Sequence, residues 1–248
     1  MWTITEQSEA FIEKDGDVVY DHTKIILRQG ENYFSATVKE RVPKPEDLDI
    51  TSLDMAHIPS EDFCPEFKHG ITIAPDNLSN TYIKRPSLVA WDPSHPKTIG
   101  DLVRHEAEIC EILKEHPHPN ITKYLGCVVK DGRITGLCLV KYTSTLSEIL
   151  AKSSAFERAM YCKDIERGVC HLHQLGLVHN DLNPTNIMMD GNIPIIIDFD
   201  SCRRTGEKLA SKAGTFGWEI EGAEFATPEN DLYSLAKIRE LMLQPRYY

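Results

Sequence analysis

The first 40 residues alternate polar positions with β-branched and aromatic ones, as in the run from Tyr33 to Val38. This period of two is typical of half-buried strands and predicts two or three short strands, with turns at Asp15-Gly16 and at Gln29-Gly30-Glu31. The stretch Pro43 to Asp54 carries two prolines and a run of acidic residues, which predicts an exposed linker. A second β-rich region is expected at about 64–92.

Helical spacing of apolar residues begins further along the chain, and it predicts a helix from Thr98 to Glu115. Two strands follow at 121–129 and 134–142, and Asp131-Gly132 between them is a strong hairpin signal. Helices are then expected at 146–152 and 155–175, short apolar strands at 187–189 and 195–197, and a last helix at 228–243. The order predicts a mainly β half followed by a mainly α half.

Composition places the 248-residue chain among ordinary globular proteins, since 41% of its residues are hydrophobic and 26% are charged. A formal net charge of −11 repels phosphate backbones, which disfavours non-specific binding of nucleic acid unless a local basic patch overrides it.

The 7 cysteines are scattered, with no C-x-x-C pair, and indicate reduced thiols rather than a disulfide framework or a zinc site. The first residues show no basic region followed by an apolar one, and no apolar stretch is long enough to cross a membrane. We therefore expect a cytoplasmic or nuclear protein with no membrane partner.

The residues that carry chemistry lie between Val178 and Asp200. The run Val-His-Asn-Asp-Leu-Asn-Pro-Thr-Asn-Ile ends at Ile187, and Ile-Asp-Phe-Asp follows at 197–200. Phosphoryl transfer needs a carboxylate near the attacking hydroxyl and hard oxygen ligands for Mg²⁺. Both runs resemble the catalytic loop and metal-binding motif of protein kinases and their aminoglycoside-kinase-like relatives. The resemblance implies ATP and Mg²⁺ as cofactors, Asp181 as catalytic base, and Asn186 and Asp198 as metal ligands.

Upstream residues extend the resemblance over about 64–240. Lys84, on a predicted strand, looks like the lysine that binds the α- and β-phosphates, and Glu106 stands where the helix glutamate that pairs with it is found. Lys141 and Tyr142 occupy the place of the hinge that offers backbone groups to adenine. Asp231 resembles the buried aspartate that supports the catalytic loop.

The same resemblance predicts an α+β fold with two kinase-like lobes. It places an N-terminal β extension with its acidic linker at 1–62, a kinase-like N-lobe at 63–142 and a truncated kinase-like C-lobe at 143–248.

The sequence also departs from the kinase pattern. No G-x-G-x-x-G precedes Lys84, so the resemblance does not extend to the loop whose backbone amides cradle phosphates in kinases. Asn180 replaces the usual arginine, Asn183 the usual lysine, and Asp200 the usual glycine. After Gly-Thr-Phe-Gly-Trp at 214–218 there is no A-P-E, and the chain stops soon after its last predicted helix. A protein substrate is therefore not expected.

These features resemble short fungal kinase-like proteins and leave three functions open. The first is an ATP- and Mg²⁺-dependent phosphotransferase acting on a small molecule or another non-peptide acceptor. The second, implied by similar chains of natural-product gene clusters, is a tRNA-dependent synthase of arginine-containing cyclodipeptides. Its basic segment would contact tRNA or another anion through Arg203, Arg204, Lys208 and Lys212. The third is a non-catalytic pseudokinase that serves as a binding module.

Overall fold

A computed structural model describes residues 1–14, 16–44, 46, 48–150, 153–209 and 214–243. The chain divides into two compact units. The first combines residues 1–68, 85–104 and 129–136, and the second combines 69–84, 105–128 and 137–248.

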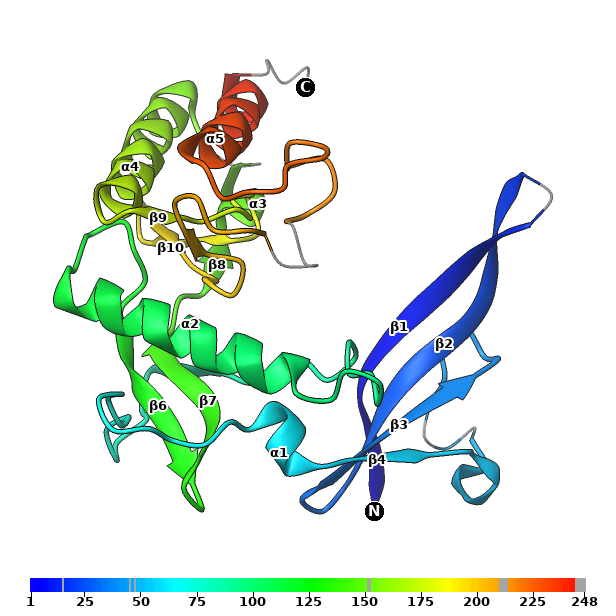
Figure 1. Cartoon of the computed structure of the whole chain (residues 1–248). Coiled ribbons are helices and arrows are strands. Elements are labelled where there is room, and N and C mark those ends of the chain that lie inside the picture. Colours follow the sequence, from blue (N-terminus) through cyan, green and yellow to red (C-terminus); the bar gives the residue numbers. More distant parts are fainter. Residues whose placement is uncertain (15, 45, 47, 151–152, 210–213, 244–248) are drawn as a thin grey trace. The chain divides into compact units, whose positions relative to one another are not determined.

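The first unit is built on an antiparallel sheet in the order β1-β2-β3-β4 (Figure 1). Its strands are β1 (Trp2–Lys14), β2 (Asp17–Gln29), β3 (Asn32–Val38) and β4 (Ala56–Ile58), and the short helix α1 (Ser60–Phe63) follows. Ile26 on β2 packs with Ile58, Phe63 and other apolar residues on one face. Its neighbours Ile25 and Leu27 pack into a second cluster on the other face. Because β2 is covered on both faces at this point, Ile25, Ile26 and Leu27 are three consecutive buried apolar residues.

The predicted linker at 43–54 is exposed at polar residues such as Lys44, Asp49 and Asp54, but its apolar residues are partly buried. The segment contains the short 3-10 helix η2 (Ile50–Ser52), and Leu48, Ile50 and Leu53 pack against the cluster around Ile25 and Leu27. Prolines and acidic residues predicted a solvated chain, but the apolar residues between them cover a sheet face that would otherwise meet water.

A second sheet has the order β5-β7-β6. Its strands are β5 (Thr81–Lys84), β6 (Tyr124–Lys130) and β7 (Arg133–Val140). Between 64 and 92 the structure forms just one strand, β5, together with isolated bridges such as Ile73 to Cys127. The predicted β-rich region was therefore too extensive, because Pro65, Gly70 and Pro75 interrupt regular pairing.

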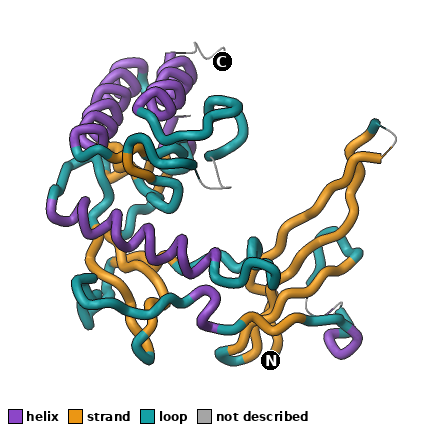
Figure 2. The backbone as a smooth tube through the Cα atoms, viewed as in Figure 1, coloured by secondary structure: helices purple, strands orange, loops and turns teal. Residues whose placement is uncertain are grey.

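The helix α2 (Thr98–Glu115) has the predicted bounds and belongs to both units, with residues 98–104 in the first and 105–115 in the second. Its continuity is visible in the backbone trace (Figure 2).

The rest of the second unit is mainly helical and contains α3 (Leu146–Leu150), α4 (Ala155–Gln174) and α5 (Pro228–Leu243). Helix α4 begins at a capping box between Ser154 and Glu157, and Gly176, with φ of 71°, follows its C-cap. Helices α4 and α5 lie side by side (Figure 1). No helix of the described ranges has the length and apolarity needed to cross a membrane.

Short strands next to these helices carry the loops of the site. One sheet has the order β11-β10-β8, formed by β8 (Ser144–Thr145), β10 (Ile187–Asp190) and β11 (Ile193–Ile196). A separate pair joins β9 (Leu177–Val178) to β12 (Arg203–Arg204). The ends of β9 and β11 therefore begin the two loops that the sequence singled out for chemistry.

Replacing Gly126 with alanine should destabilise the fold by about 2 kcal/mol or more. Gly126 has φ of 134°, and a Cβ there would lie 2.5 Å from the backbone of Ile73 and Ala74. The matched control is Gly132→Ala, where φ is 73° and no atom lies within 4 Å of the added carbon. In this control, the left-handed backbone strain of the alanine should lower the free energy of unfolding by about 1 kcal/mol. Urea unfolding of both variants measures the difference, and equal losses would contradict the close approach at Gly126.

Candidate active site

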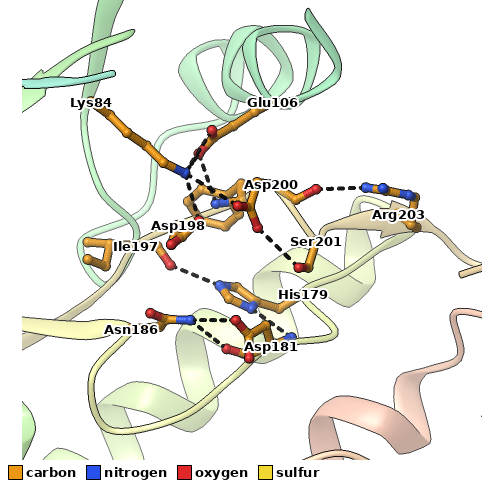
Figure 3. A network of polar contacts seen from close by, with 11 residues as sticks. Lys84, Glu106, His179, Asp181, Asn186, Ile197, Asp198, Asp200, Ser201 and Arg203 are labelled. Atoms are coloured by element: carbon orange, nitrogen blue, oxygen red, sulfur yellow. Dashed lines mark hydrogen bonds and ion pairs between the residues drawn. The ribbon is translucent and has the colours of Figure 1, made fainter. Parts of the chain in front are cut away.

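Lys84 is the centre of a charged cluster drawn from distant parts of the sequence (Figure 3). Its Nζ atom lies 2.7 and 2.8 Å from the two carboxylate oxygens of Glu106 and 2.7 Å from Oδ1 of Asp198. Oδ2 of Asp200 lies 3.9 Å away. Strand β5, helix α2 and the loop after β11 thus converge on a single ammonium group.

Burial and charge act in opposite directions on this cluster. Burial alone would lower the pKa of Lys84, but the carboxylates of Glu106, Asp198 and Asp200 outweigh it, so the lysine pKa is raised and the ammonium form persists. Burial raises the pKa of Glu106 against the opposing effect of Lys84. The carboxylates around this ammonium leave an excess of negative charge, which favours a further cation.

The loop that carries Asp198 is anchored by its neighbour Phe199. The Phe199 side chain is almost fully buried, and its ring meets the His179 ring edge-on at a centroid distance of 5.3 Å. Its backbone N–H donates to Oε1 of Glu106 at 3.2 Å. Asp198 itself has φ of 66°, a left-handed conformation that aspartate adopts more readily than most residues.

Asp181 is buried and held by amide groups of its own loop. Nδ2 of Asn186 donates to Oδ2 of Asp181 at 3.0 Å, and Nδ2 of Asn183 donates to Oδ1 at 3.2 Å. The hydroxyl of Thr215 also donates to Oδ1, at 2.7 Å. The carboxylate therefore already accepts a hydrogen bond from an alcohol.

A buried carboxylate beneath this loop fixes its backbone. Asp231 lies in the first turn of α5 and is fully buried. Its carboxylate accepts hydrogen bonds from the N–H groups of His179 and Asn180 at 2.9 and 2.8 Å. The His173 ring donates to the same carboxylate at 2.9 Å. This is the supporting position that the sequence resemblance implied for Asp231, and the bonds satisfy a charge whose burial would otherwise be costly.

The sequence pattern does not identify two residues that contribute to the site. Asn183 replaces the usual kinase lysine, yet its Oδ1 also accepts from the N–H and hydroxyl of Thr185. In the sequence, Thr215 is one residue of the Gly-Thr-Phe-Gly-Trp motif. Gly214 beside it was the available signal, because a Cβ there would lie 2.8 Å from the Asn180 carbonyl oxygen. The glycine permits the close approach that places Thr215 at Asp181.

Three other predicted residues have contacts outside the Lys84 ion pairs. The N–H of Lys141 donates to Asn80 O at 3.4 Å, and burial raises the pKa of Tyr142. Arg203 is half-buried and its guanidinium donates to the backbone carbonyls of Asp200 and Cys202.

The rest of the predicted basic segment is only partly described. Arg204 and Lys208 are exposed. Lys212 lies outside the described residues.

The chemistry of the donors fits Mg²⁺ and phosphate. Asp198 offers carboxylate oxygens, and Asn186, whose NH₂ is used on Asp181, carries an amide oxygen of the kind that Mg²⁺ prefers. Among the described residues no group of three or more His, Cys, Asp and Glu side chains is arranged to hold a metal. A metal here would take further oxygens from a bound phosphate, which is the usual mode for Mg²⁺.

Comparison with known proteins points in the same direction. A family model described as "Protein kinase domain" matches residues 92–245, which are 154 of the 248 residues. Among similar curated proteins is "Mitogen-activated protein kinase kinase kinase 3" of Arabidopsis thaliana, 30% identical over 129 residues. That match covers 50% of this chain and 20% of the relative.

Two further similar proteins are also named as protein kinases. "Dual specificity protein kinase shkD" of Dictyostelium discoideum is 31% identical over 148 residues, covering 54% of this chain and 20% of the relative. "Serine/threonine-protein kinase shk2" of Schizosaccharomyces pombe is 30% identical over 136 residues, covering 50% and 23%. The chain spans about a fifth of the length of these relatives.

Replacing Lys84 with methionine should destabilise the fold in a pH-dependent way. Without the ammonium, Glu106 becomes a buried, uncompensated carboxylate, and at neutral pH the free energy of unfolding should fall by about 3–5 kcal/mol. Burial keeps the folded-state pKa of Glu106 above its unfolded value, so the folded state binds the proton more tightly. Stability of the variant therefore falls as pH rises through the window between these two pKa values.

Chemical denaturation at pH 5 and pH 7.5 measures this effect, and the loss should be smaller at pH 5. The double variant Lys84→Met/Glu106→Gln is the control, because it removes the titrating group and should flatten the difference between the two pH values. An equal loss for the single variant at both pH values would show that Glu106 is not the uncompensated charge.

Proposed function

Because this chain belongs to the protein kinase domain family, we propose that it transfers a phosphoryl group from ATP, with Mg²⁺, to an alcohol. One observation carries the proposal. Nζ of Lys84 lies within 2.8 Å of both Glu106 and Asp198, which come from segments 22 and 114 residues away. Such convergence of a lysine and two carboxylates matches the needs of a site that binds phosphates together with a metal.

Each residue of the cluster has a role in this proposal. Lys84 would bind phosphate oxygens, and Glu106 keeps the ammonium in place and charged. Asp198 and Asn186 would hold Mg²⁺, which supplies electrostatic stabilisation to the phosphoryl group when bound. Asp181 orients the acceptor hydroxyl and accepts its proton, and the amides of Asn183 and Asn186 hold the carboxylate for this task.

The contact of Thr215 with Asp181 supports an alcohol as acceptor. A general base must lie about 2.6–3.2 Å from the oxygen whose proton it removes. The Thr215 hydroxyl lies 2.7 Å from Oδ1 of Asp181 and also accepts from Asn183. An incoming hydroxyl would replace Thr215 at the same two partners, so the loop at 214–218 must yield when the acceptor binds.

The acceptor itself belongs to one of two classes. The relatives are named as protein kinases, which favours a serine or threonine hydroxyl of a protein. The missing A-P-E motif favours the small or non-peptide acceptor expected from the sequence. Both acceptors present an aliphatic hydroxyl to Asp181, so the proposed chemistry is shared.

Variants of the two aspartates should separate binding from transfer. Asp198→Asn should weaken Mg²⁺-dependent ATP binding by about 100-fold, because it removes a charged metal ligand. Asp181→Asn should bind ATP with nearly unchanged affinity and slow transfer by about 10²–10⁴-fold, the usual contribution of a general base. Calorimetry with and without Mg²⁺ measures binding, and radiolabelled ATP offered with serine and threonine peptides or with small alcohols measures transfer.

Asp190→Asn, at an exposed carboxylate that ends β10, is the matched control and should leave both measurements unchanged. Equal transfer by the wild type and Asp198→Asn would contradict the proposal. Tight ATP binding without transfer to either panel would instead support a pseudokinase that acts as a binding module.

One observation favours the tRNA-dependent cyclodipeptide synthase as a second candidate. Within the described ranges β5 stands at the edge of the order β5-β7-β6, so no further strand pairs beside Lys84 to bring backbone amides over a triphosphate. Exposed Arg204 and Lys208 add positive charge for an anionic partner. Mass spectrometry of reactions with aminoacyl-tRNA and no ATP is the test, and a cyclic dipeptide would favour this candidate over phosphoryl transfer.

A further inference from the structure

The connection between Lys84 and helix α2 joins the two partners of the central ion pair. It runs over residues 85–97, with Lys84 directly before it and Glu106 on the helix that follows. The connection belongs to the first compact unit, together with the N-terminal sheet. Few backbone hydrogen bonds form within residues 85–97, so side chains determine the conformation of this connection.

Glu6 on β1 holds the beginning of this connection. Its carboxylate accepts hydrogen bonds from the N–H of Leu88 at 2.9 and 3.0 Å and from the N–H of Val89 at 3.2 Å. The Ser87 hydroxyl donates to the same carboxylate at 2.5 Å. Leu88 and Val89 belong to no strand, so the Glu6 carboxylate satisfies their N–H groups in place of a sheet partner.

Trp91 holds the middle of the connection. Its indole N–H donates to Oδ2 of Asp62 at 3.0 Å in a buried contact, and its carbonyl oxygen accepts from Nζ of Lys24 at 2.5 Å. Trp91 is 5% exposed and packs with Ile26 and Leu88. Both polar partners and the apolar neighbours therefore immobilise this residue.

The first turn of α2 is held by the same unit. Ile99 is buried in the cluster that contains Ile26 and Trp91. At Gly100 an added Cβ would lie 3.0 Å from the carbonyl oxygen of Asp62, so the helix backbone passes directly over α1. Glu106 stands on the same continuous helix, about 9 Å further along its axis at 1.5 Å per residue.

We infer that the N-terminal sheet positions the Lys84–Glu106 ion pair, and that Glu6 and Trp91 are its positioning residues. The sheet fixes the chain immediately after Lys84 and the first turns of the helix that carries Glu106, so a change at Glu6 reaches the ion pair through covalently continuous elements. The inference deepens the proposed function by assigning a role to residues 1–68, which lie outside the matched family region. It concerns the ion pair itself, so it can be tested without nucleotide.

The test compares Glu6→Gln, which keeps the size of the side chain and loses its charge and one acceptor, with Glu13→Gln on the same strand, where the carboxylate is exposed. Labelling of amines with an acetylating reagent, followed by peptide mass spectrometry, reports how well Lys84 is held. Its labelling should be about 5-fold faster in Glu6→Gln and unchanged in Glu13→Gln. Backbone hydrogen exchange over residues 98–106 should be faster in Glu6→Gln and unchanged in Glu13→Gln.

A second measurement separates positioning from a general loss of stability. In the wild-type background, Glu6→Gln should lower ATP affinity about 5–10-fold. In the Glu106→Gln background, the same change should alter ATP affinity by less than about 2-fold, because the Lys84–Glu106 ion pair is already broken. Should Glu6→Gln fail to fold, Lys24→Gln, which removes the bond to the Trp91 carbonyl, takes its place in every assay.

Unchanged labelling of Lys84 in a folded Glu6→Gln protein would overturn the inference even if phosphoryl transfer is found. An equal loss of ATP affinity in both backgrounds would also overturn it. Faster labelling of Lys84 in a protein that binds no ATP would support the inference while the proposed function fails.

Discussion

The attraction between the half-buried ammonium of Lys84 and its carboxylate neighbours is the constraint on which the rest of the site depends. It ties β5 to α2 and to the loop after β11, and the Phe199 N–H bound to Glu106 strengthens the same junction. Charges removed from water are stable only when paired and hydrogen-bonded. Each partner therefore holds the others in place, and the cluster behaves as a unit rather than as separate contacts.

Much of this arrangement follows from local sequence signals. The bounds of α2 and the first residue of α5 agree with the prediction, because α2 has a clear apolar period and a proline marks the start of α5. The predicted α+β protein-kinase-like fold is confirmed by the family match over 92–245. The division into 1–62, 63–142 and 143–248 stays a prediction, and the compact units follow a different, interleaved course along the chain.

Contacts between distant segments could not be read from the sequence. Glu6 on β1 looks like any surface carboxylate until the chain returns 82 residues later to offer it backbone N–H groups. Thr215 is likewise one hydroxyl among many until Gly214 permits close approach to the catalytic loop. The partial burial of Leu48, Ile50 and Leu53 could not be predicted for the same reason, since it depends on the sheet face that they cover. The periodicity of apolar residues predicts each helix or strand separately, whereas the contacts of Glu6 and Thr215 form between elements that are distant in the sequence.

Asn180 and Asp198 both adopt left-handed backbone conformations, with φ of 62° and 66°. Short polar side chains and glycine tolerate this region, while longer or branched ones pay roughly 1–2 kcal/mol. The range of residues acceptable at these two positions is thus narrowed by backbone geometry before chemistry is considered. A glutamate at 198 would preserve the charge and still fit poorly, so the loop backbone would accept an asparagine or a glycine there more readily than the larger acid.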